Sequence, residues 1–183
     1  MTIPNALTFL RIALIPLFVV LFWLPFHWTD LAAAAVFLLA ATTDWLDGYL
    51  ARRLGQTSRL GAFLDPVADK LIVAVALILL LQREPTVGLA LPTMVIIGRE
   101  ITVSALREWM AELGARAKVA VSRMGKVKTT FQMIALTLMI ARQPVAGLPS
   151  DLIGIVALYV AAALTLWSMV LYLRAAWPAL SED

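Results

Sequence analysis

The chain has 183 residues, of which 62% are hydrophobic, and its mean hydropathy is +0.89. Soluble domains are nearer half apolar, so this composition indicates a membrane protein rather than a soluble globular enzyme. The absence of cysteine excludes disulfides and thiolate metal sites, and a single histidine, His27, cannot make a zinc site alone. The net charge is only +3, and the placement of the basic residues is more informative than their total.

Six segments qualify or nearly qualify as membrane-crossing helices, which need about 20 mostly apolar residues. They cover approximately residues 5–26, 31–51, 61–82, 86–110, 126–142 and 150–174. The first resembles a signal peptide, but Arg11 and the bulky residues at the expected cleavage position favour a retained span. Because no repeat or linker indicates a second domain, residues 1–183 are expected to form a single transmembrane domain.

The first and last segments differ from the four between them. Residues 12–26 and 152–173 are uncharged and can face lipid, whereas the middle segments reach spanning length only with a polar end. Basic residues gather near 52–60 and 107–128, which the positive-inside rule places in the cytoplasm together with both termini. The polar ends then lie on the cytoplasmic side. The predicted fold is an all-α integral membrane protein of about six transmembrane helices around a cytoplasm-facing polar cavity.

Four aspartates lie at the polar ends of the second and third segments. Asp44 and Asp47 are three residues apart, and Asp65 and Asp69 are four apart, so each pair shares one helix face. Because the two helices are antiparallel and joined by a short connection, the four carboxylates can converge. They would repel one another unless some were protonated or a cation lay among them. An all-oxygen cluster suits a hard divalent ion such as Mg²⁺ or Mn²⁺.

A different explanation treats these aspartates as juxtamembrane acids paired with Arg52, Arg53 and Arg59 of the connecting loop. Two pairs at helical spacing, both set deeper than that loop, favour the metal site instead. Gly48 directly follows the first pair and would let a ligand approach the backbone. Packing between helices is an equally open reason for a glycine at that position.

The pattern D-x2-D-G-x2-A-R-x8-G-x3-D-x3-D, from Asp44 to Asp69, resembles the complete signature of the CDP-alcohol phosphotransferase family. The family is similarly built from about six transmembrane helices around a cytoplasm-facing cavity and is usually homodimeric. The resemblance implies that two divalent cations, Mg²⁺ or Mn²⁺, bind the pyrophosphate of a CDP-linked lipid. It implies that these two cations are bound by Asp44, Asp47, Asp65 and Asp69.

The resemblance also assigns roles beyond metal binding. It implies that Asp69 is the base that deprotonates the incoming alcohol. It implies that Gly48, Arg52 and Ser58 contact the CDP moiety of the donor lipid, CDP-diacylglycerol.

Two further stretches, "IPNALTFLRIALIPLF" and "GKVKTTFQM", resemble the phosphatidylglycerophosphate synthase branch of the family. Its acceptor is sn-glycerol 3-phosphate, and its products are phosphatidylglycerophosphate and CMP. Cations on the fourth and fifth segments favour a phosphorylated acceptor on physical grounds. The candidate phosphate-binding residues are Arg99, Arg107, Lys126 and Lys128.

Three of these cations also have a structural explanation. Lys126 and Lys128 could simply orient the protein and contact anionic lipids. An arginine as deep as Arg99 is expected to be functional or paired, and Glu100 is the candidate partner. Whether Arg99 contacts substrate or only Glu100 stays open at this point.

Alternative functions are the same chemistry with inositol phosphate, serine or phosphatidylglycerol as acceptor, or a cation transporter that uses the aspartates as a relay. Transporters often show inverted repeats with midplane sites, whereas these acids lie toward one face. The expected location is the cell (inner) membrane, multi-pass, with the active site facing the cytoplasm. The expected partners are CDP-diacylglycerol, glycerol 3-phosphate, membrane lipids and a second copy of the chain, with no nucleic acid.

Overall fold

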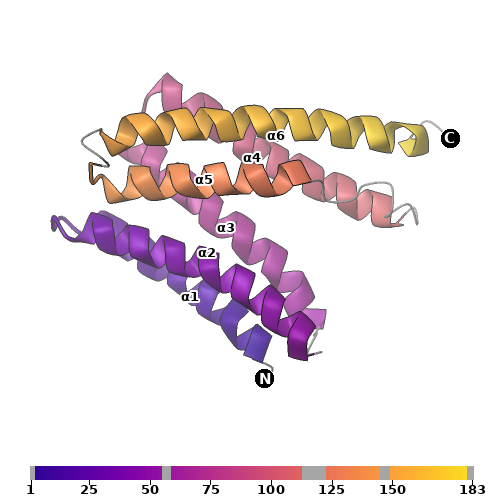
Figure 1. The fold of residues 1–183 in the computed structure, drawn as a ribbon, viewed down its shortest axis with the longest axis horizontal. Coiled ribbons are helices and arrows are strands. Elements are labelled where there is room, and N and C mark those ends of the chain that lie inside the picture. The colour runs from indigo at the N-terminus through magenta and orange to yellow at the C-terminus, as the bar shows by residue number, and fades with distance from the viewer. Residues whose placement is uncertain (1–2, 55–58, 113–122, 145–148, 181–183) are drawn as a thin grey trace.

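The structure, a computed structural model, describes the backbone of residues 3–54, 59–112, 123–144 and 149–180. It describes the side chains of these residues except at 3–4, 44–45, 47–54, 59–60, 62, 123–126 and 178–180. All the regular structure within these ranges is helical (Figure 1). The six helices are α1 (Ile3–Trp23), α2 (Thr29–Leu54), α3 (Arg59–Arg83), α4 (Val87–Glu112), α5 (Arg123–Ala141) and α6 (Ser150–Leu180).

Each helix corresponds to one predicted segment, and the boundaries differ for identifiable reasons. α1 ends at Trp23, short of the predicted end, because Pro25 disfavours helical geometry at the residue before it. α6 continues to Leu180, beyond the predicted end at 174, because arginine and alanine are good helix formers. The prediction had equated the end of the apolar run with the end of the helix. At the start of α4 the Thr86 hydroxyl accepts a hydrogen bond from the Leu89 amide at 3.2 Å, which caps the helix.

Small residues let the helices pack closely, as is typical of membrane proteins. Phe18 of α1 and Phe37 of α2 are completely buried, with ring centroids 6.0 Å apart. Ala33 and Ala40 of α2 are also fully buried beside them. At the contact of α5 with α6, a Cβ atom on Gly154 would lie 3.2 Å from the Ala135 carbonyl oxygen and would also collide with the Met139 side chain. These contacts hold together the two helix pairs α1–α2 and α5–α6.

The start of α1 lies at the bottom of the view beside the end of α2, and the end of α6 lies at the right (Figure 1). The end of α2 and the start of α3 lie at the lower right of that view, and the end of α4, the start of α5 and the end of α6 lie at the right. The opposite helix ends lie at the left. α1 and α3 therefore run in the same direction, and these two helices contact each other.

The described helices confirm an all-α integral membrane protein. Three of them contain stretches long and apolar enough to cross a bilayer, at Asn5–Trp23, Val87–Glu112 and Ser150–Trp177. α2 and α5 contribute shorter apolar stretches, Thr29–Thr43 and Val127–Ala141. The number of spans, the side of the termini and the cytoplasm-facing cavity stay predictions.

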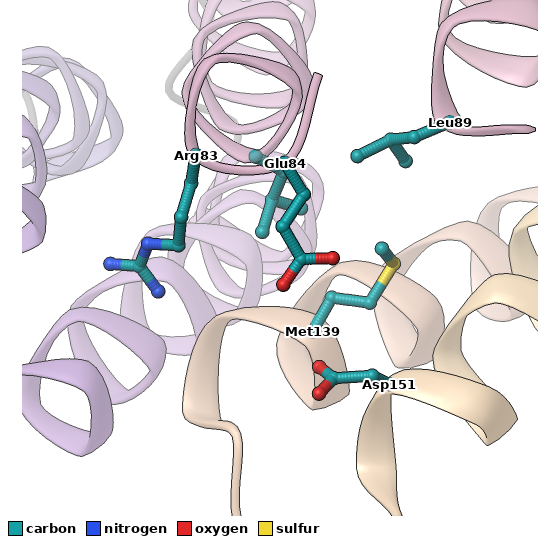
Figure 2. A pocket seen from close by; sticks show the side chains of 6 residues that line it. Arg83, Glu84, Leu89, Met139 and Asp151 are labelled. Carbon is teal, nitrogen blue, oxygen red and sulfur yellow. The ribbon is translucent and has the colours of Figure 1, made fainter. Parts of the chain in front are cut away.

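A small hollow lies between the end of α3 and the starts of α4 and α6, as Figure 2 shows. Glu84 and Asp151 contribute its carboxylates, and Met139 and Leu89 its apolar wall. Nearby, Arg83 pairs with Asp30 at 2.9 Å. The hollow lies at the end of α3 opposite Asp65 and Asp69, so it is separate from the predicted cavity.

Candidate active site

The acidic face of α3 forms as predicted, and α1 contributes its hydrogen-bond donors. Asp65 and Asp69 are four residues apart on one helix, so their side chains share a face. The Thr8 hydroxyl donates to Asp65 Oδ1 at 2.6 Å, and Arg11 Nη1 donates to Asp69 Oδ1 at 2.5 Å. α1 and α3 run in the same direction. Thr8 and Arg11, which are three residues apart on α1, therefore reach Asp65 and Asp69, which are four residues apart on α3.

The donors and the acceptors of these two bonds differ in burial. Thr8 is 1% exposed and Arg11 is completely buried, whereas the Asp69 side chain is 41% exposed. Burial of a guanidinium away from water costs free energy unless a carboxylate compensates its charge. The Asp69 carboxylate compensates the charge of Arg11. The carboxylate is thus held from the protein side and remains accessible to a ligand.

The other half of the predicted acidic cluster belongs to α2. Asp44, Asp47, Gly48 and Arg52 lie in the last part of this helix, which packs against α3, but their side chains lie outside those described. Ser58 lies outside the described residues altogether. Within the described side chains no group of three or more potential metal ligands gathers. Convergence of all four aspartates therefore stays a prediction.

A second polar cluster joins α4 to α5. Glu100 Oε1 accepts from Lys128 Nζ at 2.5 Å and from Arg99 Nη1 at 3.1 Å. Lys128 is 5% exposed and Arg99 is 7% exposed. Two of the predicted phosphate-binding cations are therefore brought together by one carboxylate. The side chain of a third, Lys126, lies outside those described.

α6 completes this cluster with residues to which the sequence had assigned no role. Arg99 Nη2 donates to the Ser168 hydroxyl at 3.2 Å, so Arg99 contacts more than Glu100. Arg107 Nη2 donates to the Tyr172 hydroxyl at 2.7 Å. The guanidinium carbons of Arg99 and Arg107 lie 5.6 and 5.1 Å from the centroid of the Tyr172 ring, within the range of cation–π contact. Arg107 thus joins the other two cations through Tyr172.

A hydrogen bond between α3 and α4 joins the residue next to Asp69 to the helix that carries Arg99 and Glu100. Lys70, which follows Asp69 directly, donates to the Ser104 hydroxyl, and Ser104 donates to the Glu100 carbonyl at 2.5 Å. Sequence reasoning missed Lys70 and Ser104 as well as Thr8 and Arg11. Only Arg11 had a signal, because it is the one charged residue within the apolar first segment. Hydroxyl groups such as Ser104 carry no pattern that distinguishes them from ordinary helix residues.

The fold and these clusters define an integral membrane protein that presents carboxylates beside cations in one part of a helix bundle. Residues 1–167 match the CDP-alcohol phosphatidyltransferase family, and the chain belongs to that family. It is therefore an enzyme of the phosphatidyltransferase class, and the resemblance carried by the aspartate pattern is confirmed.

Curated relatives match the chain along almost its whole length. It is 57% identical to the CDP-diacylglycerol–glycerol-3-phosphate 3-phosphatidyltransferase of Pseudomonas fluorescens, over 100% of this chain and 94% of that protein. It is 55% identical to the protein of the same name from Sodalis glossinidius, over 96% of this chain and 95% of the relative. The corresponding values for the protein of that name from Pectobacterium atrosepticum are 56%, 95% and 94%.

Proposed function

We propose that this enzyme transfers the phosphatidyl group of CDP-diacylglycerol to sn-glycerol 3-phosphate, which gives phosphatidylglycerophosphate and CMP. The names of the full-length relatives support both substrates. The observation that carries the proposal is that Glu100 holds the cations Arg99 and Lys128 together on α4, the helix that Lys70, the residue after Asp69, reaches through its hydrogen bond to Ser104. This arrangement supports a proton acceptor on α3 and a site for the phosphate of the acceptor on the neighbouring α4 and α5.

The acidic face fits hard divalent cations by the chemistry of its donors. Asp65 and Asp69 supply only carboxylate oxygens, which Mg²⁺ and Mn²⁺ prefer. A carboxylate offers about four acceptor positions, so one bond from α1 leaves it able to bind a cation. With Asp44 and Asp47 of α2, these residues would hold two divalent cations. When bound, the cations would neutralise the pyrophosphate and stabilise the attacking and leaving oxygens.

Asp69 would act as the base in the transfer itself. Its carboxylate takes the proton from the acceptor hydroxyl as the hydroxyl oxygen bonds to the phosphorus of the phosphatidyl group. The bond from that phosphorus to the CMP oxygen breaks, and CMP leaves. Most of the rate acceleration in such a step comes from positioning and charge neutralisation. Asp69 is suited to both because Arg11 fixes one of its oxygens.

The basic cluster would bind the phosphate of the acceptor. Lys128 and Arg99 are buried and already oriented by Glu100, so little side-chain freedom is lost when an anion binds. Arg107 is exposed and is held by Tyr172, so it would contribute at the rim. Lys126, which lies in the first turn of α5, is proposed as a fourth contact.

The remaining parts of the proposal concern the donor lipid, the assembly and the location. Gly48, Arg52 and Ser58 are proposed to contact the CDP moiety. Residues 1–183 are proposed to form a single domain that assembles as a homodimer. The location proposed for this multi-pass protein is the inner membrane, with the active site open to the cytoplasm.

The acceptor is tested with purified enzyme in detergent by measuring CMP release from CDP-diacylglycerol. Glycerol 3-phosphate, inositol phosphate, serine and phosphatidylglycerol are supplied in turn. Metal-dependent CMP release with glycerol 3-phosphate, at least tenfold above the others, is the expected result. Release that is faster with another acceptor would refute the proposed acceptor and leave the family assignment intact.

Lys128→Ala is expected to raise the KM for glycerol 3-phosphate about 10- to 100-fold while kcat changes little. A charge-assisted hydrogen bond contributes roughly 1.5–3 kcal/mol, and 1.4 kcal/mol is about tenfold. The measurement is steady-state kinetics with varied acceptor at saturating CDP-diacylglycerol. Arg142→Ala is the matched control, because it removes an ion-paired cation near Glu84, away from the site. Unchanged kinetics in Lys128→Ala would assign this lysine to orientation of the protein.

A further inference from the structure

α1 reaches the acidic face of α3 with two side chains that the aspartate signature does not include. Arg11 is the one charged residue of α1, and it is completely buried against Asp69. Thr8, one turn earlier, is 1% exposed and bonds to Asp65. Two donors at helical spacing therefore match two carboxylates at helical spacing on the neighbouring helix.

We propose that Arg11 and Thr8 are positioning residues for the transfer reaction, which hold Asp69 and Asp65 by one oxygen each. This inference rests on the proposed function, because it concerns the aspartates that would bind cations and remove the proton. Each bond restricts rotation of its carboxylate. Since the Asp69 side chain stays 41% exposed, the held carboxylate is still open to substrate.

The environment of Arg11 makes it suited to this task. Leu14 and Ile15 on the next turn of α1 and Phe18 one turn further are buried, and Arg11 itself is completely buried, so its guanidinium lies at the edge of the packed core. An arginine is always charged, and its planar group presents donors in a fixed geometry. A lysine or a water molecule would supply charge or hydrogen bonds without this fixed orientation. Arg11 therefore fixes the direction of Asp69 as well as compensating its charge.

This role predicts opposite changes in cation binding and in turnover. The positive charge of Arg11 repels any divalent cation bound at Asp69, so its removal should tighten cation binding. The same change frees Asp69 to rotate, so the reacting geometry is populated less often and kcat should fall. A residue that only stabilises the fold would weaken both when it is replaced.

The test uses the purified full-length enzyme and its Arg11→Gln and Arg11→Lys variants. Binding of Mn²⁺ without substrate is measured by the loss of the free-ion signal in electron paramagnetic resonance, and kcat by CMP release. Arg11→Gln is expected to lower kcat about 30-fold or more and to bind Mn²⁺ several times more tightly. Arg11→Lys keeps the charge, so its Mn²⁺ affinity should match the wild type, with kcat partly recovered.

Two further variants keep the test decisive if Arg11→Gln does not fold. Thr8→Val preserves the shape of the side chain and its neutral charge, so kcat should fall several-fold with unchanged Mn²⁺ affinity. Arg83→Gln is the matched control, since it removes another ion-paired arginine, which contacts Asp30. It should change neither quantity.

Wild-type kcat in Arg11→Gln and Thr8→Val would overturn the inference, and so would weaker Mn²⁺ binding in Arg11→Gln together with lost turnover. Failure of the proposed function has a different signature. In that case the wild-type enzyme itself releases no CMP with any acceptor. The Mn²⁺ affinities of wild type and Arg11→Gln would still decide the inference, because unchanged affinity would refute it.

Discussion

Asp69→Asn is expected to lower turnover by about a thousandfold or more while the protein still folds. A general base typically contributes about 10²–10⁴-fold, and the substitution also removes a charged ligand for the cations. The fold should survive, at a lower thermal stability, because asparagine has nearly the same shape and its carbonyl oxygen can still accept a hydrogen bond from Arg11, although the charge of the buried guanidinium is no longer compensated by Asp69. The loss should therefore lie in chemistry and cation binding rather than in packing.

The measurement compares CMP release by wild type and Asp69→Asn, with thermal unfolding in detergent as the check on folding. Asp151→Asn is the matched control, since this aspartate lies in the first turn of α6, beside the hollow at the other end of α3. It should keep wild-type turnover. More than a tenth of wild-type activity in Asp69→Asn would show that Asp69 is neither the base nor an essential ligand.

Removal of divalent cations is the second change with a large expected effect. Treatment with EDTA should abolish CMP release, because the aspartates would then face the pyrophosphate with no cation between them. Addition of Mg²⁺ or Mn²⁺ in excess should restore it. Thermal stability should also rise with added Mn²⁺, since a ligand that binds only the folded state stabilises that state.

The control for this experiment is EDTA saturated with Mg²⁺ beforehand, which should leave activity unchanged. Full turnover after dialysis against EDTA alone would exclude a metal-dependent reaction. Lost turnover that neither ion restores would point to damage by the chelator and would count against the two-cation proposal as well.

Much of the fold could be predicted from the pattern of apolar residues. The six helices and their order follow from apolar stretches that are visible in the sequence, although the four middle segments reach about 20 residues only with a polar end. The helix ends were less predictable, because they depend on local effects such as Pro25 beside the end of α1. The continuation of α6 past Arg174 follows from helix propensity, which is a different property from hydropathy.

The candidate site also has one part that the sequence predicts and another part that depends on how the helices pack. The spacing of Asp65 and Asp69 determines that they share a face, and the structure confirms it. Spacing does not determine which neighbouring helix that face meets, so the contacts from Thr8 and Arg11 were not foreseen. The contact of Arg99 with Ser168 also depends on the packing of α4 against α6, which periodicity does not specify.

The most direct test of the central claim is a crystal of the enzyme grown with Mn²⁺ and measured near the manganese absorption edge. The claim is that α2 and α3 aim their paired aspartates at one shared site. We expect two anomalous peaks enclosed by Asp44, Asp47, Asp65 and Asp69. No peak among these residues, or carboxylates from α2 and α3 that point away from each other, would contradict the claim.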